Sequence, residues 1–160
     1  MAADLPAALA AQAGRWRVFL DANVLISGVL SRTGASAAIL DLGEAEEIVV
    51  VVSQQVLVEA DRTFLKKFPH LIERYRKFIK NLAPLLLEDP SPAAVKEAAK
   101  AIDPGDAPIL ASAKQGRVDF LVSLNTKHFH TPAAREYFAA PIVTPGEFLM
   151  AFREFWEKTL

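Results

Sequence analysis

The chain has 160 residues, of which 52% are hydrophobic and 23% charged, and its 18 Lys and Arg nearly balance 19 Asp and Glu, which gives a formal charge of -1. This length suits one domain with one core, which at this size needs no disulfide or structural metal for stability. The absence of cysteine excludes thiolate catalysis, thiolate zinc sites and disulfides, and it favours a cytoplasmic location. Because the net charge is near zero, any nucleic-acid site must be local.

The first sixteen residues are rich in alanine and precede the first strand-like run. Asp4 stands where an export signal needs basic residues, and Pro6 and Gln12 interrupt the apolar stretch, so we do not expect export. Alanine favours helix, which predicts a helical extension over residues 1–16, followed by a single domain over residues 17–160. No stretch approaches the ~20 apolar residues of a membrane span, so we expect no membrane association.

Short, continuously apolar runs alternate along the chain with longer segments of helical period. The runs cover residues 18–20, 48–52, 85–87, 120–122 and 142–143. Such runs, rich in β-branched residues, are typical of strands buried on both faces of a parallel sheet. In addition to a short helix that begins near Asn23, helices are expected over residues 54–68, 71–82, 92–101, 107–115 and 145–156. Strands that alternate with helices predict an α/β fold, a three-layer α/β/α sandwich around a mostly parallel central sheet.

Acidic and amide side chains follow several of the predicted strands. Asp21 comes directly after the first strand, and Glu59 lies about two turns into the helix after the second. Asp106 opens the helix before the fourth strand, and Asn125 follows that strand. Because open parallel sheets bind ligands at the carboxyl ends of their strands, we expect these side chains at one rim. Oxygen ligands without sulfur suit a hard cation, Mg²⁺ or Mn²⁺, which supports phosphoryl transfer to water.

Each of these residues also has an ordinary structural explanation. Asp21 is equally suited to cap the helix that follows it, and Glu59 alone would be a solvated helix residue. Either Asp103 or Asp106 suits the N-cap of the helix over 107–115. Asn125 is of a type common in turns. The residue types taken singly therefore leave a structural role and a metal-binding role open.

Taken in chain order, these segments resemble the PIN-domain ribonucleases. The resemblance extends over residues 17–152 and rests on residues 19–27, 53–59, 103–113, 120–129 and 142–148. It implies a PIN-like parallel sheet flanked by helices, dependence on Mg²⁺ or Mn²⁺, and cleavage of single-stranded RNA. It also implies a common role as the toxin of a toxin–antitoxin pair, with an antitoxin protein as partner, and it predicts a homodimer.

Carried over position by position, the resemblance makes Asp21, Glu59 and Asp106 the first three acidic metal ligands. Asn125 stands where the family usually has a fourth acid. A carboxamide oxygen can ligate a cation but brings no charge, so we expect one tightly held ion and a second that binds weakly. The polar residues expected to support the ligands are Asn23, Ser123 and Asp103.

Local positive charge for RNA is expected on the helix after the second strand and beside Asn125. The candidate contacts are Arg62, Lys66, Lys67, Lys127 and His128. The competing interpretation is that charged residues on amphipathic helices form an ordinary solvated face.

The sequence leaves two functions open. The first is a metal-dependent endoribonuclease, and the second is a catalytically weak or inactive RNA-binding or partner-binding module on the same fold, which Asn125 favours. A phosphatase of the haloacid dehalogenase type is less compatible with the chain. It needs a second Asp two residues after Asp21 as general acid, and the chain has Asn23 there.

Overall fold

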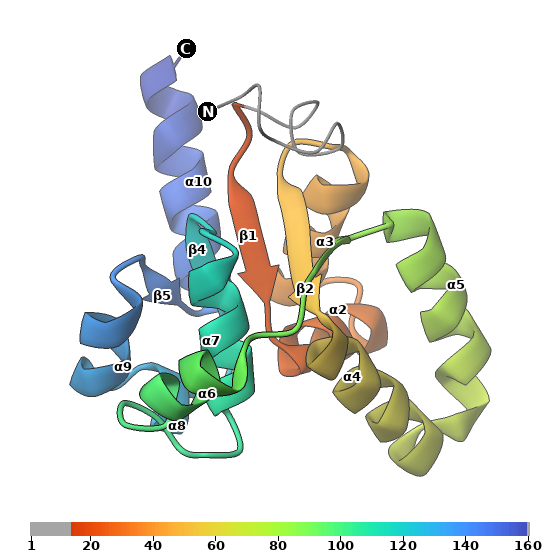
Figure 1. Cartoon of the computed structure of the whole chain (residues 1–160). Coiled ribbons are helices and arrows are strands. Elements are labelled where there is room, and N and C mark those ends of the chain that lie inside the picture. The colour runs from red at the N-terminus through yellow and green to blue at the C-terminus, as the bar shows by residue number, and fades with distance from the viewer. Residues whose placement is uncertain (1–13, 160) are drawn as a thin grey trace.

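A computed structural model describes residues 14–159 of the chain. Its strands form one sheet in the order β3-β2-β1-β4-β5, and every neighbouring pair is parallel. They are β1 (Arg17–Leu20), β2 (Val49–Ser53), β3 (Leu85–Leu87), β4 (Phe120–Val122) and β5 (Ile142–Val143). The predicted strands are therefore present, and the parallel α/β fold is confirmed (Figure 1).

Helices cover both faces of this sheet (Figure 1). They are α2 (Ala22–Leu30), α3 (Ala35–Glu44), α4 (Gln54–Lys67), α5 (Ile72–Leu82), α6 (Pro92–Ala98), α7 (Ala107–Gln115), α8 (Thr126–Phe129), α9 (Pro132–Phe138) and α10 (Pro145–Thr159), with a 3-10 turn η2 (Pro69–Leu71) before α5. The helices α3 and α10 pack together on one face, whereas α6 and α7 lie on the other. The helices α2 and α4 contact each other where β1 and β2 end.

Burial explains why the apolar runs become strands. Every residue of β2, which reads VVVVS, is buried, and the last three residues of β1 are fully buried. An interior strand of a parallel sheet has helices on both faces, so apolar side chains in both directions leave water. The edge strand β3 is only partly buried, in keeping with its position beside a single neighbour.

The helices differ from the expected ones in several places. The helices α3, α8 and α9 were not predicted, and the helix expected over 92–101 ends at Ala98, after which the chain continues in turns. The helix expected over 71–82 begins at Ile72, after η2. Most of the expected helical extension over 1–16 lies outside the described residues, and residues 14–16 form a turn into β1.

Within residues 14–159, no single helix has both the length and the hydropathy of a membrane span. The helices α2 and α3 reach the threshold only as a pair, with a bend of 96° between them.

Candidate functional site

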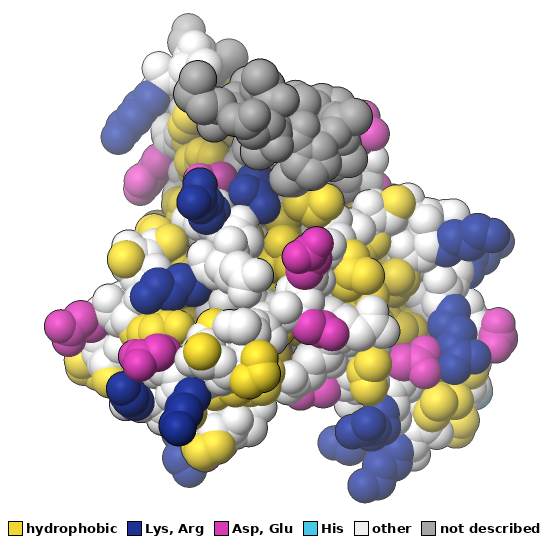
Figure 2. Space-filling view, in the orientation of Figure 1, with side chains coloured by type: hydrophobic (Ala, Val, Ile, Leu, Met, Phe, Trp, Pro, Cys, Tyr) yellow, Lys and Arg dark blue, Asp and Glu magenta, His cyan; other side chains and the backbone are white. Residues whose placement is uncertain are grey.

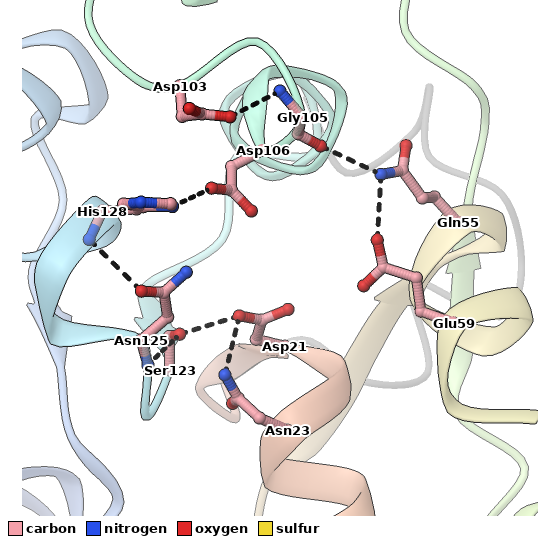
Figure 3. Close-up of polar contacts among 10 residues, drawn as sticks. All are labelled: Asp21, Asn23, Gln55, Glu59, Asp103, Gly105, Asp106, Ser123, Asn125 and His128. Carbon is pink, nitrogen blue, oxygen red and sulfur yellow. Dashed lines mark hydrogen bonds and ion pairs between the residues drawn. The ribbon is translucent and has the colours of Figure 1, made fainter. Parts of the chain in front are cut away.

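The four residues predicted as ligands lie at the carboxyl edge of the sheet (Figure 3). Asp21 follows β1, Glu59 lies in α4 after β2, Asp106 immediately precedes α7, and Asn125 follows β4. All four line one hollow of about 320 Å³, which Arg62 of α4 also lines. Segments far apart in the sequence therefore place three carboxyl groups and one amide around a single space.

Asp21 is the most buried member of this group, with only 5% of its surface exposed. Its Oδ1 accepts a hydrogen bond from the backbone N–H of Ala22 at 2.8 Å, which caps α2. Its Oδ2 accepts bonds from Ser123 Oγ at 2.7 Å and from Asn23 Nδ2 at 3.3 Å. The capping role and the position in the site, which were alternatives in the sequence, are thus combined in one carboxyl group.

The electrostatic surroundings of Asp21 show that the carboxyl groups influence one another. Burial raises the pKa of Asp21 above its usual value, and the hydrogen bonds from Ser123 and Ala22 oppose this rise. Repulsion from the charges of Glu59 and Asp106 raises the pKa further. A divalent cation relieves such repulsion, and carboxylate oxygens are the ligands that Mg²⁺ and Mn²⁺ prefer. The residues present therefore fit the cation that the sequence predicts.

The predicted supporting residues Asn23 and Ser123 connect α2 to the segment after β4. Ser123 is fully buried, and its Oγ accepts a hydrogen bond from the backbone N–H of Asn125 at 3.0 Å while it donates to Asp21. Asn23 Oδ1 accepts from the backbone N–H of Leu124 at 3.1 Å. These bonds fix the relative positions of Asp21 and Asn125, which come from neighbouring strands.

Asp103 closes the turn before α7. Its Oδ1 accepts from the backbone N–H of Gly105 at 2.9 Å, and its side chain is exposed. Asp106 occupies the N-cap position of α7, but its side chain makes no capping bond. The carboxyl group of Asp106 instead faces the hollow and His128 (Figure 3). The capping explanation offered for Asp106 therefore does not describe its side chain.

His128 is bonded to Asp106, although the sequence suggested it only as an RNA contact. The Nδ1 of His128 lies 2.6 Å from Asp106 Oδ2. A carboxylate oxygen accepts hydrogen bonds, so we assign Nδ1 as the donor of this bond. The three side chains Asp103, Asp106 and His128 also have ligand atoms within 4.8 Å of one another, so they form a second group that could hold a metal ion.

Gln55 is a further polar neighbour that sequence reasoning missed. Its Nε2 donates to Glu59 Oε1 at 3.2 Å and lies 3.4 Å from the carbonyl oxygen of Gly105. It connects α4 to the turn before α7 on the side opposite Asn125 (Figure 3). The sequence did contain a signal for this contact, because Gln55 lies four residues before Glu59 on the same predicted helix, and side chains at that spacing are neighbours. The bond between His128 and Asp106 had no comparable local signal, since 22 residues separate them.

The predicted RNA contacts are spread around the site rather than gathered in it. Arg62 lines the hollow and also a neighbouring groove of about 440 Å³ along α4. Lys66 and Lys67 lie in the last turn of α4, and Lys127 lies in α8, and all three are exposed. Figure 2 shows basic side chains over α4 and α5, at the lower right of the view. Basic side chains also lie on other parts of this face, so they do not form a single patch at the hollow.

Three solved structures share this fold at low sequence identity. FitAcB from Neisseria gonorrhoeae has a TM-score of 0.58 and 22% identity, and the match covers 80% of this chain and 97% of that one. VapBC2 from Rickettsia felis, bound to a DNA fragment from their promoter, has a TM-score of 0.60 and 17% identity, over 80% and 98% of the two chains. PAE2754 from Pyrobaculum aerophilum has a TM-score of 0.60 and 16% identity, over 87% and 96%.

The family assignment comes from the sequence itself. No curated protein matches the chain significantly. Residues 17–127, which include β1 to β4 and all four predicted ligand positions, match the PIN domain. With the fold and the carboxylate hollow in agreement, this protein belongs to the PIN-domain family.

Proposed function

We propose that this protein is a metal-dependent endoribonuclease that hydrolyses phosphodiester bonds of single-stranded RNA. The observation that carries the proposal is the convergence of Asp21, Glu59 and Asp106 on one hollow, where burial first, and then the charges of Glu59 and Asp106, raise the pKa of Asp21. Perturbed carboxyl groups in a cleft are typical of functional sites. Membership of the PIN-domain family supports nuclease chemistry at this place.

In the proposed reaction, Asp21, Glu59 and Asp106 are the residues that would hold Mg²⁺ or Mn²⁺. The cation, when bound, supplies positive charge that offsets the charge of the phosphate and makes water more acidic. The water oxygen forms a bond to phosphorus and the water loses a proton, one phosphorus–oxygen bond to ribose breaks, and the leaving ribose oxygen takes up a proton. The hydrogen bonds from Ser123 and Ala22 hold Asp21 in place, so the buried ligand does not reorganise during the reaction.

RNA is proposed to approach along α4. Arg62 lies at the hollow, and Lys66 and Lys67 lie one turn further along the helix, where their exposed ammonium groups can contact successive phosphates. Lys127 lies on α8, near the opposite side of the hollow. A strand held by these contacts would pass over the carboxyl groups.

The decisive experiment measures Mn²⁺-dependent cleavage of single-stranded RNA by the purified protein. Asp106→Asn is the cleaner variant because the Asp106 side chain caps no helix, and Asp21→Asn is the second. We expect each to lower the rate by at least about 10²-fold while the circular dichroism spectrum stays the same. Asp89→Asn is the matched control, since Asp89 is exposed and does not line the hollow. Full activity in both site variants would refute the proposal.

A second function is favoured by one observation, the presence of Asn125 at the fourth position. An RNA-binding or partner-binding module with a weak or inactive site would retain the fold and the basic side chains. It would bind single-stranded RNA with equal affinity with and without Mn²⁺, and Mn²⁺ would not stimulate turnover. The cleavage assay above therefore separates the two functions.

We further propose that the protein acts in the cytoplasm as the toxin of a toxin–antitoxin pair and forms a homodimer. The structural similarity to VapBC2, which was solved with a DNA fragment from their promoter, supports a partner protein of this kind. Co-purification with the product of a small neighbouring reading frame, and loss of RNA cleavage in that complex, are the expected results. Cleavage that persists unchanged in the complex would contradict the antitoxin role.

A further inference from the structure

The side chain of Asn125 has a fixed orientation because only its oxygen can make the hydrogen bond that it forms with the backbone. Its Oδ1 accepts a hydrogen bond from the backbone N–H of His128 at 3.3 Å, which caps α8. The amide nitrogen of Asn125 cannot accept that bond, so the oxygen must face His128. Nδ2 consequently points toward the space between Asp106 and Asp21 (Figure 3). The atom that Asn125 presents to the hollow is a hydrogen-bond donor.

The backbone of Asn125 is also held in place. Its N–H donates to Ser123 Oγ at 3.0 Å, and the same Ser123 hydroxyl donates to Asp21 Oδ2 at 2.7 Å. A rotation of the side chain that brought Oδ1 into the hollow would leave the N–H of His128 without its capping oxygen. The donor therefore stays directed at the hollow.

An amide NH₂ has no lone pair to offer a cation, but it can donate to an anionic oxygen. We propose that Asn125 binds the scissile phosphate through Nδ2 and does not ligate the cation. This assignment rests on the proposed ribonuclease function, and it replaces the metal-ligand role expected for Asn125 from the sequence. Arg62 lines the same hollow from α4, so an RNA phosphate would meet donors from two opposite elements.

Two substitutions at this position keep the cap and change only the group in the hollow. Asn125→Ser retains an N-cap oxygen but removes Nδ2, and Asn125→Asp keeps the shape but replaces the NH₂ with a negatively charged oxygen. Asn81→Ser is the matched control, since Asn81 is exposed in α5 and does not line this hollow. Thermal unfolding of each variant would show that the fold is preserved.

The experiment uses two probes, Mn²⁺ alone and inorganic phosphate added to the Mn²⁺-saturated protein, each measured by isothermal titration calorimetry. We expect Asn125→Ser to bind Mn²⁺ with the same stoichiometry and an affinity within about twofold of the wild type, and to bind phosphate roughly tenfold more weakly. Asn125→Asp should bind Mn²⁺ more tightly or bind an additional ion, because it adds a carboxylate to the hollow.

Two results would overturn the assignment while the proposed function stands. One is a tenfold or greater loss of Mn²⁺ affinity in Asn125→Ser, which would make Asn125 a metal ligand. The other is unchanged binding of both probes, which would leave the amide without a role. Failure of the ribonuclease proposal is separate, because it would appear as wild-type protein that binds no Mn²⁺ or as full RNA cleavage in both Asp106→Asn and Asp21→Asn.

Discussion

Asp21 has two roles, because it caps a helix and also lines the candidate site. Its Oδ1 caps α2, where the helix N-terminus favours negative charge, and Ser123 donates to its other oxygen. These interactions lower the pKa of Asp21, yet burial and the neighbouring carboxylates raise it more, and the net shift is upward. The hollow is thus organised around a charge that the protein alone does not fully stabilise, and the cation proposed above would offset the repulsion.

We expect His128 to act on the proposed metal site through its contact with Asp106. The bond of 2.6 Å from His128 Nδ1 occupies Oδ2 of Asp106 and so sets the direction of the other carboxylate oxygen. Removing such a partner of a ligating group typically costs 10–100-fold in metal affinity. We therefore predict that His128→Ala weakens Mn²⁺ binding by roughly tenfold, measured by calorimetry.

The variant His128→Asn tests whether His128 acts through its Nδ1 hydrogen bond to Asp106. The amide nitrogen of Asn can take the place of Nδ1 and donate to Asp106, so this variant should recover most of the lost Mn²⁺ affinity. Equal losses in His128→Ala and His128→Asn would show that His128 does not act through its Nδ1 hydrogen bond. Because the backbone N–H of His128 makes the bond to Asn125, both variants retain the cap of α8.

At the scale of elements, the sequence predicted all the described strands, but it did not predict the helices α3, α8 and α9. The strands are signalled by continuous apolar runs, and burial on both faces requires those runs. The helix α3 had no such local signal, since Gly34 precedes it and provides no side-chain cap. It forms because Ala37, Ile39 and Leu40 are buried against neighbouring elements, and that contact depends on the tertiary fold.

The packing of α2 on α3 depends on one glycine. A Cβ at Gly28 would overlap Leu40 Cδ1 and lie 3.2 Å from the carbonyl carbon of Ser36. We predict that Gly28→Ala lowers the free energy of unfolding by about 1–3 kcal/mol, measured by urea denaturation. Gly146→Ala in α10 is the matched control, because a Cβ at this position would meet no atom within 4 Å apart from those of its own helix backbone and its chain neighbours. It should stabilise the protein by about 0.4–1 kcal/mol. A loss of stability in both variants would contradict the packing argument.

At the scale of the whole molecule, the convergence of the four predicted side chains on one hollow was predictable, and the hydrogen bonds among their neighbours were not. Parallel strands place the residues that follow them at one edge, which is why Asp21 and Asn125 could be grouped from the sequence, and Asp106 joins them at the start of the helix that leads back to β4. The orientation of the Asn125 amide depends on α8, a helix too short to leave a periodic pattern. The bond between His128 and Asp106 depends on two segments that meet only in the folded chain.

The aromatic side chains of α10 are buried near its start and exposed near its end. Phe148 near its start is fully buried under the sheet, whereas Phe155 and Trp156 near its end are 45% and 40% exposed. Phe155 also contacts Trp16, with 4.9 Å between the ring centroids. Exposed aromatic side chains of this kind are enriched at the centres of protein interfaces. The end of α10 is therefore the face at which we expect a second copy of the chain.

Light scattering of the purified protein tests this expectation. The wild type should have twice the chain mass of 17.5 kDa, and Trp156→Ala should shift the mass toward 17.5 kDa at the same concentration. Leu65→Ala is the matched control, because Leu65 is similarly exposed, at 50%, but lies on α4 rather than α10. A wild-type mass of 17.5 kDa would exclude the homodimer, and a dimer broken by Leu65→Ala but not by Trp156→Ala would place the interface on α4. In that second case the partner copy would lie beside Arg62 and the hollow, where it would restrict the approach of RNA.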